Sequence, residues 1–132
     1  MGIVTEVDLV PLPNEPWAYS YVPRGWVGSV NTITAALTNV APGFKVVQIK
    51  QKFGSLRYYY ELPDDVSGET AAEVAEMVRA VEDAALTRCE ICGAAGRLRK
   101  ENPYWWRTLC DEHEGSREEV NVPLRVRGDS DE

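Results

Sequence analysis

The sequence predicts an α+β fold, and three patterns in the 132-residue chain support that prediction. Apolar residues recur at three- and four-residue steps over residues 27–40 and 70–87, which is typical of helices packed on one face. Between them, residues 44–62 alternate around a glycine, as the strands of a β-hairpin do. Cysteine and histidine then form two closely spaced pairs, as in metal-binding units. The expected order is helix, β-hairpin, long helix and metal-binding unit.

Composition is that of an ordinary globular protein with excess negative charge. The formal net charge is -7. No apolar run reaches the length of a membrane span, and the N-terminus lacks the pattern of a secretory signal. We therefore expect a cytoplasmic protein with no membrane partner. The net charge argues against broad binding of nucleic acid, which needs a basic surface, but it leaves room for a local basic patch.

Residues 1–24 predict an arm rather than a regular element. Prolines at this density exclude a helix, and Trp17, Tyr19 and Tyr21 alternate as side chains on one face of an extended segment do. Two interpretations stay open: the aromatic side chains pack on the domain, or they bind a partner. The rest of the chain divides into an α+β core, a metal-binding unit and a partly flexible tail, at residues 25–88, 89–116 and 117–132.

The first helix is expected over residues 27–40. Threonines lower its intrinsic propensity, so packing of its apolar stripe must stabilise it. Proline and glycine at Pro42-Gly43 end it. The stripe consists of Val27, Val30, Ile33, Leu37 and Val40.

The hairpin is expected to turn at Gly54-Ser55, because glycine takes the positive φ that tight turns demand. Three cations cluster near this turn, Lys50, Lys52 and Arg57. A solvated face and a specific contact with an anion or partner are both open interpretations of that cluster. The expected buried faces carry Val47 and Ile49 on the first strand and Leu56, Tyr58, Tyr60 and Leu62 on the second.

The second helix is expected over residues 70–87 and leads directly to Cys89. Thr70 and Glu73 have the spacing of a capping box, in which each side chain satisfies a free backbone N–H. Its apolar stripe consists of Ala71, Val74, Val78, Val81 and Ala85.

The cysteine and histidine pairs predict a structural zinc site. Cys89 and Cys92 form the first pair, and Cys110 and His113 the second. The chain has three cysteines and one histidine, and all four belong to this pattern. An odd number of cysteines argues against a disulfide scaffold. Four ligands, three of them thiolates, favour a closed tetrahedral Zn²⁺ site over a catalytic one, which keeps a position open.

The ligand spacing also predicts the topology around the metal. Gly93 suits a sharp knuckle, residues 97–109 form a second hairpin, and a helix beginning at Cys110 would place Cys110 and His113 on one face. Knuckle, hairpin and helix together resemble a treble-clef zinc finger. A zinc ribbon, with the second pair on another knuckle, is the alternative.

A longer set of motifs resembles a known family. The run Gln48-Ile49-Lys50-Gln51-Lys52-Phe53-Gly54-Ser55-Leu56-Arg57-Tyr58-Tyr59-Tyr60 precedes a helix, then Cys-Glu-x-Cys-Gly-x-x-Gly and Trp-x-x-Thr-Leu-Cys-Asp-x-His. This order resembles a family of small uncharacterised zinc-binding proteins from phages and bacteria, which carry a Lys-Phe-Gly-x-Leu-Arg-Tyr-Tyr signature. The resemblance covers roughly residues 25–115. It implies a bacterial or phage cytosolic setting and brings no established activity.

We expect no enzymatic activity. The residue types best suited to acid–base and nucleophilic chemistry near neutral pH are committed to the metal. No nucleophile elbow or phosphate loop occurs in the sequence. A hydrolase that uses carboxylates is the weaker alternative.

The expected function is that of a protein-binding module. Tyr104, Trp105 and Trp106 lie on one short strand beside Arg107, and alternation prevents all three rings from facing the same side. We expect Trp105 or Trp106 to be partly exposed and to contact a host or phage protein or a second copy of the chain. Burial of all three rings by the protein's own arm is the competing interpretation.

The alternative function is nucleic-acid binding by the second hairpin, residues 97–109, here called the zinc hairpin. It would use the basic side chains of that hairpin, with Trp105 or Trp106 stacking on bases. Those side chains are Arg97, Arg99, Lys100 and Arg107.

Overall fold

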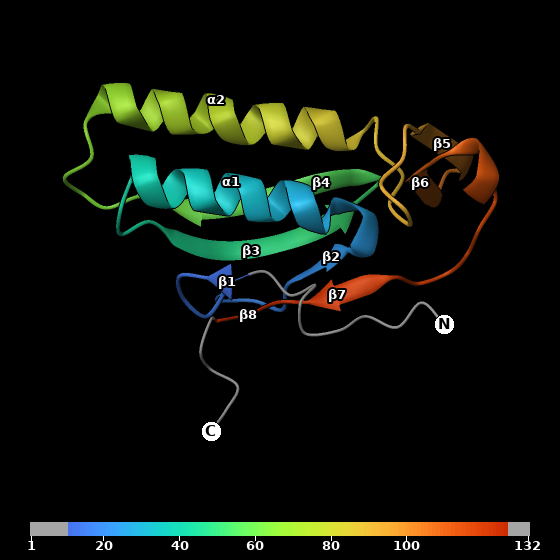
Figure 1. Ribbon diagram of the computed structural model, residues 1–132, viewed down its shortest axis with the longest axis horizontal. Coiled ribbons are helices and arrows are strands. Elements are labelled where there is room, and N and C mark those ends of the chain that lie inside the picture. The colour runs from blue at the N-terminus through green and yellow to red at the C-terminus, as the bar shows by residue number, and fades with distance from the viewer. Residues whose placement is uncertain (1–10, 127–132) are drawn as a thin grey trace.

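The computed structural model describes residues 11–126 as an α+β fold with the predicted order of elements (Figure 1). Two helices pack against each other and lie over one face of the first hairpin, and the second hairpin follows at the far end of the long helix. The elements are helices α1 (Val27–Val40) and α2 (Gly68–Ala85), hairpin strands β3 (Lys45–Lys52) and β4 (Ser55–Glu61), and hairpin strands β5 (Arg97–Asn102) and β6 (Trp105–Leu109).

The two ends of the described chain pair with each other. Strand β2 (Tyr21–Pro23) is antiparallel to β7 (Asn121–Pro123), and β1 (Pro11–Leu12) is parallel to β8 (Arg125–Val126). The expected tail therefore forms strands up to residue 126. This pairing places Leu12, Val22 and Val122 in the main core. The outer parts of the expected arm and tail, residues 1–10 and 127–132, lie outside the described residues.

The arm contributes aliphatic side chains to the core but leaves two of its aromatic rings in solvent. Trp17 is 62% exposed and Tyr19 is 73% exposed, while Tyr21 is half-buried. The segment runs along β3, where the backbone N–H of Trp17 donates to the carbonyl of Val47 at 3.1 Å.

Helix α1 has the predicted bounds, and its stripe is buried except at Val40, which is partly buried. A 3-10 turn at Arg24–Trp26 precedes it. Trp26 is fully buried, and its indole N–H donates to the carbonyl of Arg88 at 2.9 Å, which ties the start of α1 to the segment that follows α2. A hydrogen bond of 2.7 Å between Thr34 and the Tyr58 hydroxyl ties α1 to β4.

The first hairpin differs from the prediction in its turn and in one register. Phe53 and Gly54 occupy the turn with φ of 54° and 77°, whereas Ser55 pairs with Lys52 in the ladder. Positive φ at both central residues is the type I′ geometry that two-residue hairpins favour. The expected buried pair was Val47 and Ile49. A bulge between Val46 and Gln48 instead buries Val46 with Ile49, because the extra residue reverses the alternation.

Helix α2 begins before the expected Thr70 cap. Ser67 is the N-cap, and its hydroxyl accepts from the backbone N–H of Thr70 at 3.0 Å. The helix buries Val74, Val78 and Ala85 against α1 and β4. Within residues 11–126, no helix is both long and apolar enough to cross a membrane.

Candidate metal centre

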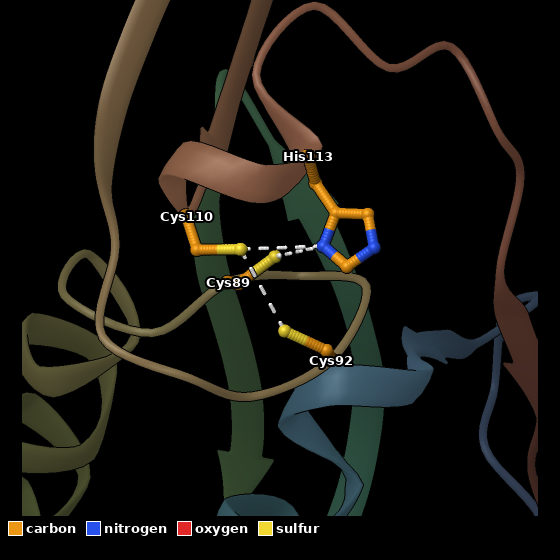
Figure 2. Close-up of side chains that lie close together, drawn as sticks. All are labelled: Cys89, Cys92, Cys110 and His113. Carbon is orange, nitrogen blue, oxygen red and sulfur yellow. Dashed lines mark hydrogen bonds between the residues drawn. The ribbon is translucent and has the colours of Figure 1, made fainter.

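The four predicted ligands converge at the junction between α2 and the second hairpin (Figure 2). All four ligand atoms lie within 4.8 Å of one another. His113 Nδ1 lies 3.3 Å from Cys110 Sγ and 3.6 Å from Cys89 Sγ, and Cys92 Sγ lies 3.8 Å from Cys110 Sγ. The predicted ligand set is therefore brought together in full, and it can hold a metal ion.

These separations fit the edges of a zinc tetrahedron. With Zn–S and Zn–N bonds of about 2.3 and 2.0–2.1 Å, tetrahedral geometry requires S···S near 3.8 Å and S···N near 3.6 Å. A disulfide would bring two sulfurs to about 2.0 Å. All three cysteines are free. Thiolate sulfur and imidazole nitrogen in this arrangement are therefore chemically and geometrically suited to Zn²⁺.

The first ligand pair lies on a tight knuckle. Gly93 has φ of 83°, and its N–H donates to the carbonyl of Cys89 at 2.8 Å. Burial would raise the pKa of Cys89, but backbone N–H groups, including that of Ile91, and the His113 ring lower it to about 6. For Cys92, a backbone N–H lowers the pKa, yet burial and the neighbouring thiols raise it overall. The knuckle thus favours the thiolate form at the more buried of its two cysteines.

The second ligand pair lies on a single turn instead of the expected helix. Cys110 directly follows β6, and Asp111–His113 forms one 3-10 turn. Glu114 is already extended, and Gly115 with φ of 78° redirects the chain toward β7. The knuckle and hairpin of a treble clef are present, but its helix is not. One helical turn already brings residues three apart to the same side, so the site geometry needs no longer helix.

Glu90 anchors the metal-binding unit to the core, although no sequence pattern marks it. Its side chain is 2% exposed and lies between the two knuckle cysteines in the chain. The carboxylate accepts from Arg107 Nε at 3.0 Å, from the Thr108 N–H at 2.9 Å and from Gln51 Nε2 at 2.9 Å. Its place beside a buried ligand could not have identified it, because Asp111 lies beside the buried ligand Cys110 and is 91% exposed.

Among the expected partner-binding residues, the aromatic rings are exposed or half-buried, whereas the arginine side chain is largely buried. Tyr104 is 88% exposed, and Trp105 and Trp106 are half-buried. The Arg107 side chain is only 11% exposed, and it also donates to the carbonyl oxygens of Ser116 and Glu118. Arg107 is therefore a structural residue rather than a surface contact.

The rings line one side of a pocket of about 290 Å³, here called the aromatic pocket. Trp106 packs against Phe53 of the β3–β4 turn with ring centroids 5.5 Å apart and ring planes tilted by 57°, and Lys100 Nζ lies 4.4 Å from the Trp106 ring. Arg107 and Glu90 are also among its lining residues. Its five aromatic residues are Tyr21, Phe53, Tyr104, Trp105 and Trp106.

The expected nucleic-acid contacts do not share one basic face. Arg97 and Lys100 are exposed. The Arg99 side chain is 10% exposed, and it donates to the Leu109 carbonyl and to Asp111 Oδ1, at 3.0 and 2.9 Å.

Comparison of the chain with protein-family models, with curated proteins and with solved structures gives no match.

Proposed function

We propose that this protein is a zinc-stabilised binding module of the bacterial or phage cytoplasm, that it has no enzymatic role, and that it binds another protein through the aromatic pocket. The observation that carries this proposal is the junction of the two hairpins. There, next to the Cys₃His cluster, the Glu90 carboxylate pairs with Arg107 and accepts from Gln51 of β3, and residues of both hairpins line the aromatic pocket.

The chemistry of the ligand set supports a structural role for the metal. Three thiolates and one imidazole complete a tetrahedron and leave no position for substrate or water. Cys89 and Cys110 are buried. Zn²⁺ would stabilise the unit because its binding free energy adds to the free energy of folding.

The polar interior supports a non-enzymatic role. Within residues 11–126, Glu90 is the one buried acidic side chain, and Arg107 neutralises it. A hydrolase that uses carboxylates, the weaker alternative, would need an unpaired acid or base held in a cleft. The exposed pair Asp64 and Asp65 lies in the loop before α2.

The exposed side chains support recognition by aromatic contact. Every large hydrophobic residue that is exposed within the described range is aromatic. Tryptophan and tyrosine often anchor protein interfaces, because they bury much apolar area and lose little conformational entropy. The partner would place an apolar side chain in the aromatic pocket, against the rings that line it.

The test is affinity capture from bacterial lysate, with and without phage infection. The bait is the zinc-loaded protein, compared with Trp106→Ala and with Trp17→Ala as the matched control. Trp17 is an exposed tryptophan that does not line the aromatic pocket. We expect Trp106→Ala to lose the captured protein and Trp17→Ala to keep it, with zinc content unchanged in both. Identical captured proteins for all three baits would contradict the proposal, and the measured molar mass shows whether the partner is a second copy.

The structure supports nucleic-acid binding by the zinc hairpin less well than the sequence did. Two of its four expected cations, Arg99 and Arg107, make ion pairs within the protein. Arg97 and Lys100 remain, and Lys100 lies over Trp106.

A further inference from the structure

The two hairpins carry positive charge in a strongly acidic chain. Residues 45–61 and 97–109 hold eight of the fourteen lysines and arginines but only two of the twenty-one acidic residues. The acidic residues lie elsewhere, including five on α2. Because both helices cover one face of β3–β4 (Figure 1), the opposite face of this hairpin is separated from the acidic helix by the sheet itself.

Strand alternation defines that opposite face. Leu56 and Tyr58 are buried toward the helices, so Arg57 and Tyr59 point the other way. Their ladder partners are Lys50 and Gln48. We call this surface the outer face, and its residues are Gln48, Lys50, Lys52, Ser55, Arg57 and Tyr59.

The two facing cations of the outer face have no counter-ion among the described residues. Lys50 and Arg57 lie directly opposite each other, and like charges in this position repel. Neither forms an ion pair with any residue from 11 to 126. In addition, Arg57 Nε is buried and has no hydrogen-bond acceptor. Arg57 therefore has no carboxylate partner, and its Nε has no acceptor within the described chain, so its guanidinium group is not committed to an internal ion pair.

Aromatic rings border the cation pair. Tyr59, 42% exposed, lies two residues from Arg57 on the same face, and Phe53 at the hairpin turn is 51% exposed with Lys52 Nζ 5.9 Å from its ring. Cations that contact phosphate, beside exposed rings that stack on bases, are the two elements of single-strand recognition. A duplex would offer its phosphates but keep its bases stacked, so the rings favour a single strand.

We propose that the outer face of β3–β4 binds single-stranded nucleic acid, with phosphate at Lys50 and Arg57 and a base stacked on Tyr59. The site is separate from the Cys₃His cluster, and it goes beyond protein binding at the aromatic pocket. The acidic remainder of the chain opposes long polyanions, so the affinity depends on a few local contacts.

The experiment measures fluorescence anisotropy of labelled DNA and RNA strands of about 15 nucleotides and of a duplex of equal length. Salt is varied from about 50 to 200 mM, because each phosphate contact adds about −0.7 to the slope of log affinity against log salt for single strands. We expect tighter binding to single strands than to the duplex. No binding at the lowest salt, or equal binding to the duplex, overturns the proposal.

Variants separate phosphate contact from stacking. The change Lys50→Gln with Arg57→Gln should weaken binding at least tenfold and reduce the slope by about 1.4, two contacts' worth. Lys50→Gln alone should give half of the slope change. Tyr59→Ala should weaken binding about tenfold and leave the slope unchanged, since stacking releases no counterions. Arg79→Gln on α2, at an exposed arginine, is the charge-matched control for Lys50→Gln alone and should change neither quantity.

Two outcomes contradict the assignment even when binding occurs. Equal loss from Arg79→Gln would mean that only net charge matters. No effect of Tyr59→Ala, with heparin competing as well as an oligonucleotide, would mean a general polyanion site. The Trp106→Ala variant should still bind the oligonucleotide. The outer face and the aromatic pocket are therefore tested by different variants, and either proposal can fail without the other.

Discussion

Hairpins β3–β4 and β5–β6 each place two cations directly opposite each other, but they differ in what neutralises them. In β5–β6, Arg99 faces Arg107. Arg107 pairs with buried Glu90, and Arg99 pairs with Asp111 and lies near Glu114. In β3–β4, Lys50 faces Arg57, and neither has an acidic partner in the described chain.

The difference follows from the support that each hairpin receives. Hairpin β3–β4 lies under two helices and buries apolar side chains along both strands. In β5–β6 only Thr108 and Leu109 are buried. A hairpin with little apolar burial depends on metal, ion pairs and hydrogen bonds, whereas a well-packed hairpin can leave its charges unpaired for a ligand. The same sequence feature is therefore paired with acidic residues in one hairpin and left unpaired in the other.

Metal removal should give the largest difference between the hairpins. Structural zinc contributes about 10–16 kcal/mol in isolated zinc fingers, which is comparable with the whole stability of a small domain. We expect Cys92→Ser to lose zinc and to expose the β5–β6 amides to hydrogen exchange, while β3–β4 amides stay protected. Cys92 is exposed, so the change leaves no cavity. Equal protection of both hairpins without metal would contradict the claim that β5–β6 depends on the metal more than β3–β4 does.

Loss of the buried acid should have the next largest effect. Glu90→Gln leaves Arg107 buried without its counter-charge, which typically costs about 3–5 kcal/mol. Denaturant unfolding measures the change. Glu101→Gln is the matched control in the same unit, because Glu101 pairs with the exposed Arg117 and should cost less than about 1 kcal/mol. Similar costs for the two changes would show that the Glu90 pair is not structural.

The second arginine of the zinc hairpin should matter less. Arg99→Gln removes hydrogen bonds to the Leu109 carbonyl and to Asp111, which is exposed. Solvent screens this pair, so we expect a loss of about 1 kcal/mol in the free energy of unfolding. The neighbouring Arg97 is exposed, and Arg97→Gln should leave stability nearly unchanged. A larger loss from Arg97→Gln than from Arg99→Gln would reverse the assignment.

The smallest effect should have the opposite sign. Lys50→Glu converts a repulsive pair with Arg57 into an attractive one and should stabilise the fold by about 0.2–1 kcal/mol. Lys45→Glu is the internal control, because Lys45 faces Glu61 and the change should destabilise by a similar amount. Thermal unfolding of both variants checks the signs. A destabilised Lys50→Glu variant would mean that Lys50 stabilises the fold of the unliganded protein.

The sequence by itself determined the two long helices, the two hairpins and the four members of the Cys₃His cluster. The apolar stripe of α1 predicted its bounds, and the paired spacing of three cysteines and one histidine predicted all four members of the cluster. Both signals are local, because helical periodicity and ligand spacing act over a few residues. The zinc-binding family resemblance, the partner and the absence of catalysis stay predictions.

Only the tertiary structure decided which polar residues are structural and which are free. The sequence predicted Arg99 and Arg107 as surface cations. In the fold, Arg99 pairs with Asp111 and Arg107 pairs with Glu90. The pairing of Val22 with Val122 likewise turned an expected tail into part of the core. Such contacts join residues that lie far apart in the chain, and neither partner's local sequence encodes them. Burial and charge pairing depend on what the completed fold places opposite each side chain, which is why they could not be read in advance.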